Sequence, residues 1–240
     1  MKVWQKITLW TLGLSVWFVL LGSSSIKRDE TPYRHFSLSF ENRQDKSFLS
    51  YAEMEKLVQY ALGDSAKQLV EINKALLEES IDNHPAIRKA EVYSKIDGSL
   101  RIMLWQHNPV ARVIDKRGSF YLLENGAQMP LSKHYSEDVP LVSGEWNTES
   151  LQAIASFWKG LEKDDFFKGF FTGMACDNLE DWVLYPSKGN FKIVLGSPKQ
   201  LQEKLTKLEV FYKGAPRLKD INKLKEIDLR YDGQVICRKN

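Results

Sequence analysis

The residues that could do chemistry are few and lie far apart in this chain of 240 residues. Its four histidines are isolated, and the sequence contains neither a His-Glu-x-x-His nor a Cys-x-x-Cys metal motif. It also lacks a glycine-rich phosphate loop and a Gly-x-Ser-x-Gly nucleophile turn. The adjacent acids Glu78-Glu79 and Asp164-Asp165 point in different directions on a helix, so they do not form an acid/base dyad. We therefore predict that the protein is not an enzyme and needs no cofactor or metal.

The two cysteines, Cys176 and Cys237, both fall in strand-like segments. Cysteine often serves there as a small apolar residue, which predicts two free thiols. A disulfide between them is the alternative in an oxidising compartment.

The charge distribution is uneven but does not indicate a nucleic-acid partner. The formal net charge is +3, and residues 199–240 carry 11 Lys and Arg against 6 Asp and Glu, a local charge of +5. No recognition-helix, zinc-finger or RNA-binding pattern accompanies this excess. It is typical of a solvated basic helix, and we expect neither a nucleic acid nor a small-molecule substrate.

The N-terminal segment determines the expected compartment. Residues 7–26 are uncharged, and twenty helical residues span about 30 Å, the thickness of the bilayer hydrocarbon. Lys2 and Lys6 precede the segment. This pattern predicts a transmembrane helix at 7–26 with a cytoplasmic tail at 1–6. The alternative is a cleaved signal peptide, with small residues at 22–25 as the cleavage region. Both interpretations export the remainder of the chain.

The first part of that remainder predicts the order β-α-α-β-β. Residues 36–40 alternate as a strand, and a helix begins at Ser50 with Glu53 as a capping box and ends at Gly63. A second helix begins after Asn73 and ends by residues 84–85. A hairpin follows, in which residues 90–96 and 100–104 alternate on either side of a type I′ turn at 97–98. We expect two helices to cover one face of a three-stranded sheet.

The second part is richer in strands. We expect strands at 119–123, 139–142, 170–176, 182–185, 191–195, 227–231 and 234–238. An amphipathic helix carries Leu151, Ile154, Ala155, Trp158 and Leu161. Another is expected to begin with Ser197 as its N-cap and Pro198 as its first residue. The fold class predicted for the whole chain is α+β.

Seven short strings in this order resemble the FtsQ/DivIB family of bacterial cell-division proteins. They are NHPAIRKAEV at 83–92, LRI at 100–102, NPVAR at 108–112, G-x-x-MPL at 126–131, VPLVSG at 139–144, FKIVLG at 191–196 and IDLRY at 227–231. Each string is weakly specific alone, but their order behind an apolar segment is far more specific. The hairpin turn departs from many relatives, and the N-terminal tail is shorter than in some.

The resemblance implies a full architecture and a role. It implies an uncleaved anchor at 7–26, a POTRA domain of order β-α-α-β-β at 36–108, and a mixed β domain with packed helices at 109–240. It implies a cell-division scaffold in the cell inner membrane at the septum, whose periplasmic domains bind FtsB-like and FtsL-like proteins and help control septal peptidoglycan synthesis. The alternatives are another exported POTRA-containing binding protein, or a secreted enzyme with a cleaved signal peptide.

The last expected strand suggests how a partner binds. No later segment of the sequence can pair with residues 234–238, so one edge of the sheet can accept an extended partner. The resemblance adds the turn at 230–233, which gives the expected partner-binding residues Arg230, Tyr231, Asp232, Gly233, Gln234, Val235 and Ile236. We expect Arg230 to be exposed and able to bind a partner carboxylate bidentately, so that Arg230→Glu weakens binding without changing the thermal midpoint. A core position is the alternative for Tyr231, and a simple turn for Asp232 and Gly233.

Overall fold

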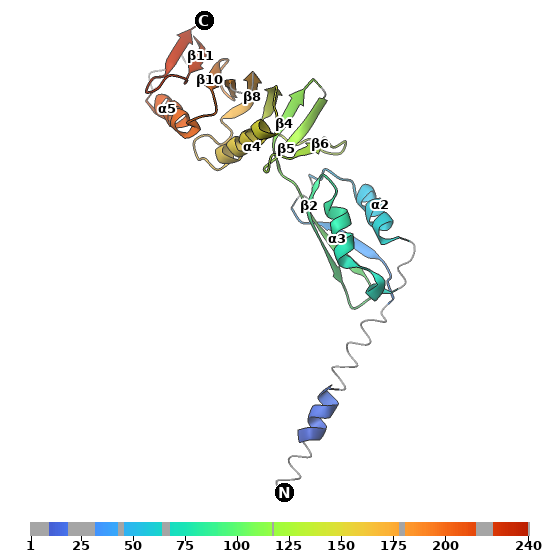
Figure 1. Cartoon of the computed structure of the whole chain (residues 1–240). Coiled ribbons are helices and arrows are strands. Elements are labelled where there is room, and N and C mark those ends of the chain that lie inside the picture. The colour runs from blue at the N-terminus through green and yellow to red at the C-terminus, as the bar shows by residue number, and fades with distance from the viewer. Residues whose placement is uncertain are drawn as a thin grey trace. The chain divides into compact units, whose positions relative to one another are not determined.

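The computed structural model describes residues 10–18, 32–42, 46–63, 68–116, 118–177, 181–214 and 223–239 (Figure 1). The chain divides into two compact units, an N-terminal unit of residues 1–106 and a C-terminal unit of residues 107–240.

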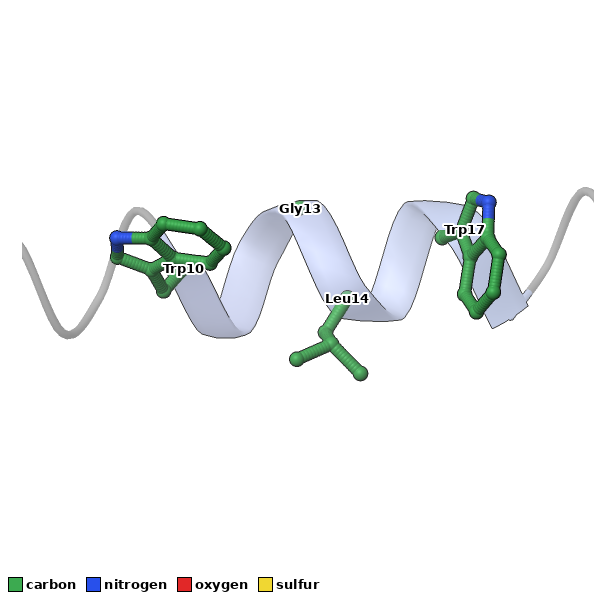
Figure 2. Close-up of a pocket in the computed structure, with 4 residues that line it drawn as sticks. All are labelled: Trp10, Gly13, Leu14 and Trp17. Atoms are coloured by element: carbon green, nitrogen blue, oxygen red, sulfur yellow. The ribbon is translucent and has the colours of Figure 1, made fainter.

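Residues 10–18 form a helix whose side chains are all exposed. Figure 2 shows Trp10 and Trp17 toward the two ends of this helix, with Gly13 and Leu14 between them, where the four residues line a pocket. The predicted span at 7–26 also includes residues 7–9 and 19–26, which lie outside the described residues. Within the described part of the chain, no helix is both long and apolar enough to span a bilayer.

The N-terminal unit contains a three-stranded sheet of order β1-β3-β2. Its strands are β1 (Phe36–Phe40), β2 (Ile87–Ser94) and β3 (Leu100–Gln106). β3 pairs parallel with β1 and antiparallel with β2. Two helices, α2 (Tyr51–Leu62) and α3 (Lys74–Asp82), and a short 3₁₀ helix, η1 (Leu69–Glu71), lie between β1 and β2 in sequence. The order β-α-α-β-β is the expected one.

The helix ends in this unit follow the capping signals of the sequence. The Ser50 hydroxyl accepts the Glu53 N–H over 3.2 Å, and the Glu53 carboxylate accepts the Ser50 N–H over 3.1 Å, which completes the predicted capping box. Gly63 ends α2 with a φ of 64°, and Asn73 caps α3 by accepting the Leu76 N–H. Both predicted helices are confirmed.

The hairpin between β2 and β3 differs from the prediction. The Gly98 N–H donates to the Lys95 carbonyl over 3.2 Å, and Gly98 has a φ of 88°. Asp97 does not have a positive φ, which a type I′ turn requires at both central positions. The turn is therefore a type I turn followed by a glycine bulge. Ile96, expected to face the core, lies in this turn and is 94% exposed.

The C-terminal unit is built on one nine-stranded sheet of order β12-β11-β10-β9-β8-β7-β4-β5-β6. The strands are β4 (Pro109–Asp115), β5 (Gly118–Leu123), β6 (Gln128–Pro130), β7 (Leu141–Gly144), β8 (Phe171–Asp177), β9 (Asp181–Pro186), β10 (Lys192–Gly196), β11 (Leu224–Asp228) and β12 (Ile236–Lys239). The pairs β4–β7, β7–β8 and β10–β11 are parallel, and the others are antiparallel. This is the mixed sheet expected for the fold class.

Two helices pack on one face of this sheet (Figure 1). They are α4 (Thr148–Glu162), which joins β7 to β8, and α5 (Leu201–Lys213), which joins β10 to β11. Each connects two parallel neighbours, which need such a crossover. The apolar residues predicted for α4 are all at most 5% exposed. Together with alternate residues of the strands they form one core, which includes the buried Trp182.

The start of α5 was predicted three residues too early. Gln200, with a φ of 55°, precedes the first helical residue, Leu201. Ser197 does not cap the helix: its hydroxyl accepts the Lys199 N–H over 3.4 Å, and its carbonyl accepts the Lys204 ammonium over 2.7 Å. Ser-Pro therefore forms the turn before the helix, and not its first residues. The expected strand 227–231 also ends earlier, at Asp228.

Candidate partner-binding edge

The last strand lies at one end of the nine-stranded sheet, near the C-terminus marked in Figure 1. β12 pairs antiparallel with β11, with Cys237 opposite Ile227. Among the described residues, no strand pairs with its other side. All four residues of β12 are exposed. The strand begins at Ile236 and ends at Lys239, slightly later than expected, and it occupies the edge position that the sequence suggests.

The hydrogen bonding of β11 determines which backbone groups of β12 face outward. The Leu229 N–H donates to the Val194 carbonyl of β10 over 2.9 Å, so odd-numbered residues of β11 face β10 and even-numbered ones face β12. Asp228 lies opposite Ile236, whose backbone therefore faces β11. Backbone groups alternate along a strand, so the N–H and C=O of Cys237 point to the free edge.

Arg230 is bound to a buried carboxylate of its own chain. Its Nε and Nη2 donate to Asp228 over 3.0 and 2.7 Å, and its backbone N–H donates over 3.1 Å. The Asp228 side chain is 1% exposed, and the hydrogen bonds from Arg230 lower its pKa. Arg230 is exposed, as expected, but its Nε and Nη2 already bind Asp228, so a partner carboxylate would have to share the guanidinium with it. Arg230→Glu would place a second carboxylate beside Asp228, so from the structure we expect a lower thermal midpoint and not an unchanged one.

Gly196 makes room for the Arg230 side chain. Gly196 has a φ of 68°, and a Cβ at this position would lie 2.7 Å from the Arg230 Cγ. A glycine is therefore required both by the backbone and by the side chain above it. This contact joins the strings FKIVLG and IDLRY, which are separate in sequence but adjacent in the fold.

Lys207 of α5 holds the chain where it leaves β11. Its ammonium donates to the carbonyls of Leu229, over 3.2 Å, and Tyr231, over 2.7 Å. The Tyr231 side chain itself is not in the core, since the residue is 50% exposed. An aromatic ring held half-exposed on a fixed backbone is a suitable contact for a partner.

The remaining residues of the expected site form a turn and the start of β12. Asp232, Gly233 and Gln234 are exposed, and Gly233 has a φ of 66°. The Gln234 N–H donates weakly to the Tyr231 carbonyl over 3.4 Å. Val235 packs partly against the core, and Ile236 is 36% exposed. The structure thus brings all seven residues into one continuous loop and edge.

A row of charged side chains crosses the sheet at this edge. Lys192 of β10, Glu226 of β11 and Arg238 of β12 are neighbours in register. Glu226 accepts from Lys192 over 3.2 Å and from Arg238 over 3.3 Å, and its side chain is 11% exposed. The Arg238 side chain is 63% exposed. This charged row, Lys192–Glu226–Arg238, ends with a cation on the edge strand β12.

Two other strand edges are protected in ways that β12 is not. On β2, the N–H groups of Ala90 and Val92 donate to carboxylates of α3, those of Asp82 and Glu78, over 2.5 and 2.6 Å. At the far end of the large sheet, β6 has only three residues and ends in Pro130. Capping by a helix, short length and proline all discourage strand addition.

The two cysteines are free, as predicted: Cys176 is buried and Cys237 is exposed. Desolvation of its sulfur raises the pKa of Cys237, so it is a thiol at neutral pH and a weak nucleophile. Burial, and then the charge of Cys237, raise the pKa of Tyr212 on α5 to about 12. In the described part of the chain, no group of three His, Cys, Asp or Glu is placed to hold a metal ion.

The family model described as "FtsQ/DivIB, C-terminal related" matches residues 108–238, which is more than half of the chain. The chain belongs to the FtsQ/DivIB family. A second model, for a POTRA-like domain, matches residues 34–105. Among curated proteins there is no significant match. One matching solved structure is the major extracytoplasmic domain of the trans isomer of the cell-division protein DivIB from Geobacillus stearothermophilus. It is 18% identical and covers 47% of this chain and 97% of its own, with a TM-score of 0.35.

Membership in the FtsQ/DivIB family implies a cell-division protein. The edge strand β12 lies within the stretch that the FtsQ/DivIB model matches. Sequence reasoning missed three residues that shape this edge: Gly196, Lys207 and Asp228. The family-like strings FKIVLG and IDLRY contain Gly196 and Asp228, and they are the only signal in the sequence for these two residues. Lys207 carried no signal, because a lysine on an amphipathic helix is ordinarily a solvated residue.

Proposed function

We propose that this FtsQ/DivIB family member is a cell-division scaffold that captures an extended segment of another division protein on β12. The segment adds to the sheet as a tenth strand and hydrogen-bonds to the outward N–H and C=O of Cys237. The observation that carries the proposal is the edge position of β12 with all four residues exposed.

The proposed site consists of Arg230, Tyr231, Asp232, Gly233, Gln234, Val235 and Ile236. Tyr231 and Ile236 are its exposed apolar contacts. Arg230 contributes indirectly: its hydrogen bonds to Asp228 hold the loop at 230–233 in place. The capped edge of β2 and the short β6 support β12 as the docking strand in preference to those two edges.

The partners proposed are the FtsB-like and FtsL-like proteins that the family resemblance implies, and capture of these helps control septal peptidoglycan synthesis. The scaffold is anchored in the cell inner membrane at the septum by residues 7–26, with residues 1–6 in the cytoplasm and the domains at 36–108 and 109–240 outside. The uncharged run at 7–26 supports this anchor, as does the exposure of the large apolar residues in 10–18.

Site-specific photo-crosslinking in growing cells tests the proposal. A photoreactive amino acid at Gln234, Cys237 or Lys239 should trap a division protein. The same probe at Glu162, an exposed residue at the end of α4, is the matched control and should not. Efficient trapping at Glu162 with none on β12 would refute docking at the edge.

A further inference from the structure

The charged row that ends at Arg238 has a consequence for the chemistry of the bound segment. Within the row, the order of charges from β10 to β12 is positive, negative, positive. Glu226 is enclosed between two cations, whereas Arg238 has an anion on one side only and faces the open edge. Opposite charges on neighbouring strands stabilise pairing, and like charges destabilise it.

We propose that the segment captured by β12 is an acidic strand that places an Asp or Glu beside Arg238 and so extends the alternating row by one charge. This inference rests on the proposed strand addition and specifies its partner. The exposed Lys239 follows Arg238 on the same strand and adds a second cation for an anionic partner.

The neighbouring positions of the segment follow from the alternation of side chains along β12. Arg238 and Ile236 point to the open face of the sheet, and Cys237, opposite Ile227, points to the helix-covered face. The residue beside Cys237 therefore lies next to the apolar core, and the residue beside Ile236 lies next to a partly exposed aliphatic side chain. The bound strand thus carries an acidic residue followed or preceded by two apolar residues.

A second copy of this chain does not fit the description. β12 has the sequence Ile-Cys-Arg-Lys and contains no carboxylate, so a β12–β12 pair would bring four cations to one edge. The cations of β12 disfavour pairing with a second β12 and favour a partner strand of negative charge.

Selection from a displayed library of nine-residue peptides tests the inference on the full chain in lipid nanodiscs. The wild type should enrich peptides with Asp or Glu at one fixed position between apolar residues. In Arg238→Glu the same position should change to Lys or Arg, and the affinity of the wild-type acidic peptides should fall about fivefold or more. Cys237→Pro removes an outward N–H without removing a bond to β11, and it should abolish enrichment. Cys237→Ala keeps that N–H and is its control.

The outcomes separate the two levels of the proposal. Two outcomes would refute the acidic strand and leave strand addition intact. In the first, the enriched peptides depend on the Cys237 N–H but have no fixed acidic position. In the second, Arg238→Glu enriches peptides with the same acidic position as the wild type. Enrichment that survives in Cys237→Pro, a failure to enrich any peptide, or a dimer of the wild-type chain through β12 would refute strand addition itself. Should Cys237→Pro unfold, photoreactive copies of the selected peptides must crosslink to residues 234–239 of the wild type, and crosslinks elsewhere count against strand addition.

Discussion

Replacing Arg230 with Gln should lower the free energy of unfolding of the C-terminal unit by about 2 kcal/mol at pH 7. The substitution leaves the Asp228 carboxylate, 1% exposed, without its guanidinium partner. Removing one member of a fully buried ion pair costs roughly 3–5 kcal/mol. Arg230 is 45% exposed, and the backbone N–H of residue 230 still donates to Asp228, so we expect a smaller loss.

The dependence of this loss on pH follows from the pKa of Asp228. The hydrogen bonds from Arg230 lower that pKa in the folded protein from its ordinary value of 3.8. The ionised carboxylate therefore contributes stability that is fully present above pH 3.8 and is lost as the pH falls through the lowered folded pKa. The difference between wild type and Arg230→Gln should be largest near neutral pH and should shrink in acid.

Urea unfolding of the full chain in detergent micelles, followed by tryptophan fluorescence, measures both quantities. Trp158 and Trp182 are buried in the C-terminal core and report its unfolding. The control is Asp228→Asn with Arg230→Gln, in which a neutral amide pair should recover part of the loss. A single Arg230→Gln variant within 0.5 kcal/mol of wild type at pH 7, roughly the scatter of neutral surface substitutions, would refute the role assigned to this pair.

Three further changes follow from the same contacts. Gly196→Ala should destabilise the C-terminal unit by about 2 kcal/mol, measured by urea unfolding, because its φ is positive and its Cβ would meet the side chain of Arg230; an unchanged midpoint would contradict that contact. Tyr231→Ala should weaken partner crosslinking at least tenfold and change the free energy of unfolding by less than about 0.5 kcal/mol, since the ring is half exposed. Equal losses of folding and binding would make Tyr231 a structural residue. Glu78→Ala should speed amide hydrogen exchange at Val92 by removing its acceptor, and an unchanged rate would show that α3 does not cap β2.

Local signals in the sequence were sufficient where one residue decides the structure. Ser50 and Asn73 begin α2 and α3, and Gly63 ends α2, as predicted, because each satisfies or permits a specific backbone arrangement at its position. The same local reasoning failed at Ser197, where a buried lysine four residues into the next helix draws the preceding carbonyls into a turn. It also failed at Ile96, whose place in the strand pattern was overridden by the glycine bulge.

The candidate edge could be predicted in position but not in detail. The expected last strand, 234–238, overlaps β12, and the sheet order places β12 at the end of the nine-stranded sheet. The pairing of Arg230 with Asp228 could not be foreseen. Both residues alternate with the apolar Leu229, which predicts a strand through residue 231 with both charges in solvent. The strand instead ends at Asp228, and Arg230 folds onto its carboxylate. The charged row depends on register across three strands from distant parts of the sequence, which no local pattern specifies.

Amide hydrogen exchange of the full chain tests docking on β12 most directly. It is measured before and after addition of the division protein that the crosslinking experiment identifies. The N–H of Cys237 faces the free edge and should exchange quickly in the free protein, then become protected by at least tenfold in the complex. Ile236 and Arg238, whose N–H groups already face β11, should change less. A complex in which residues 234–239 exchange as in the free protein would show that the partner binds elsewhere.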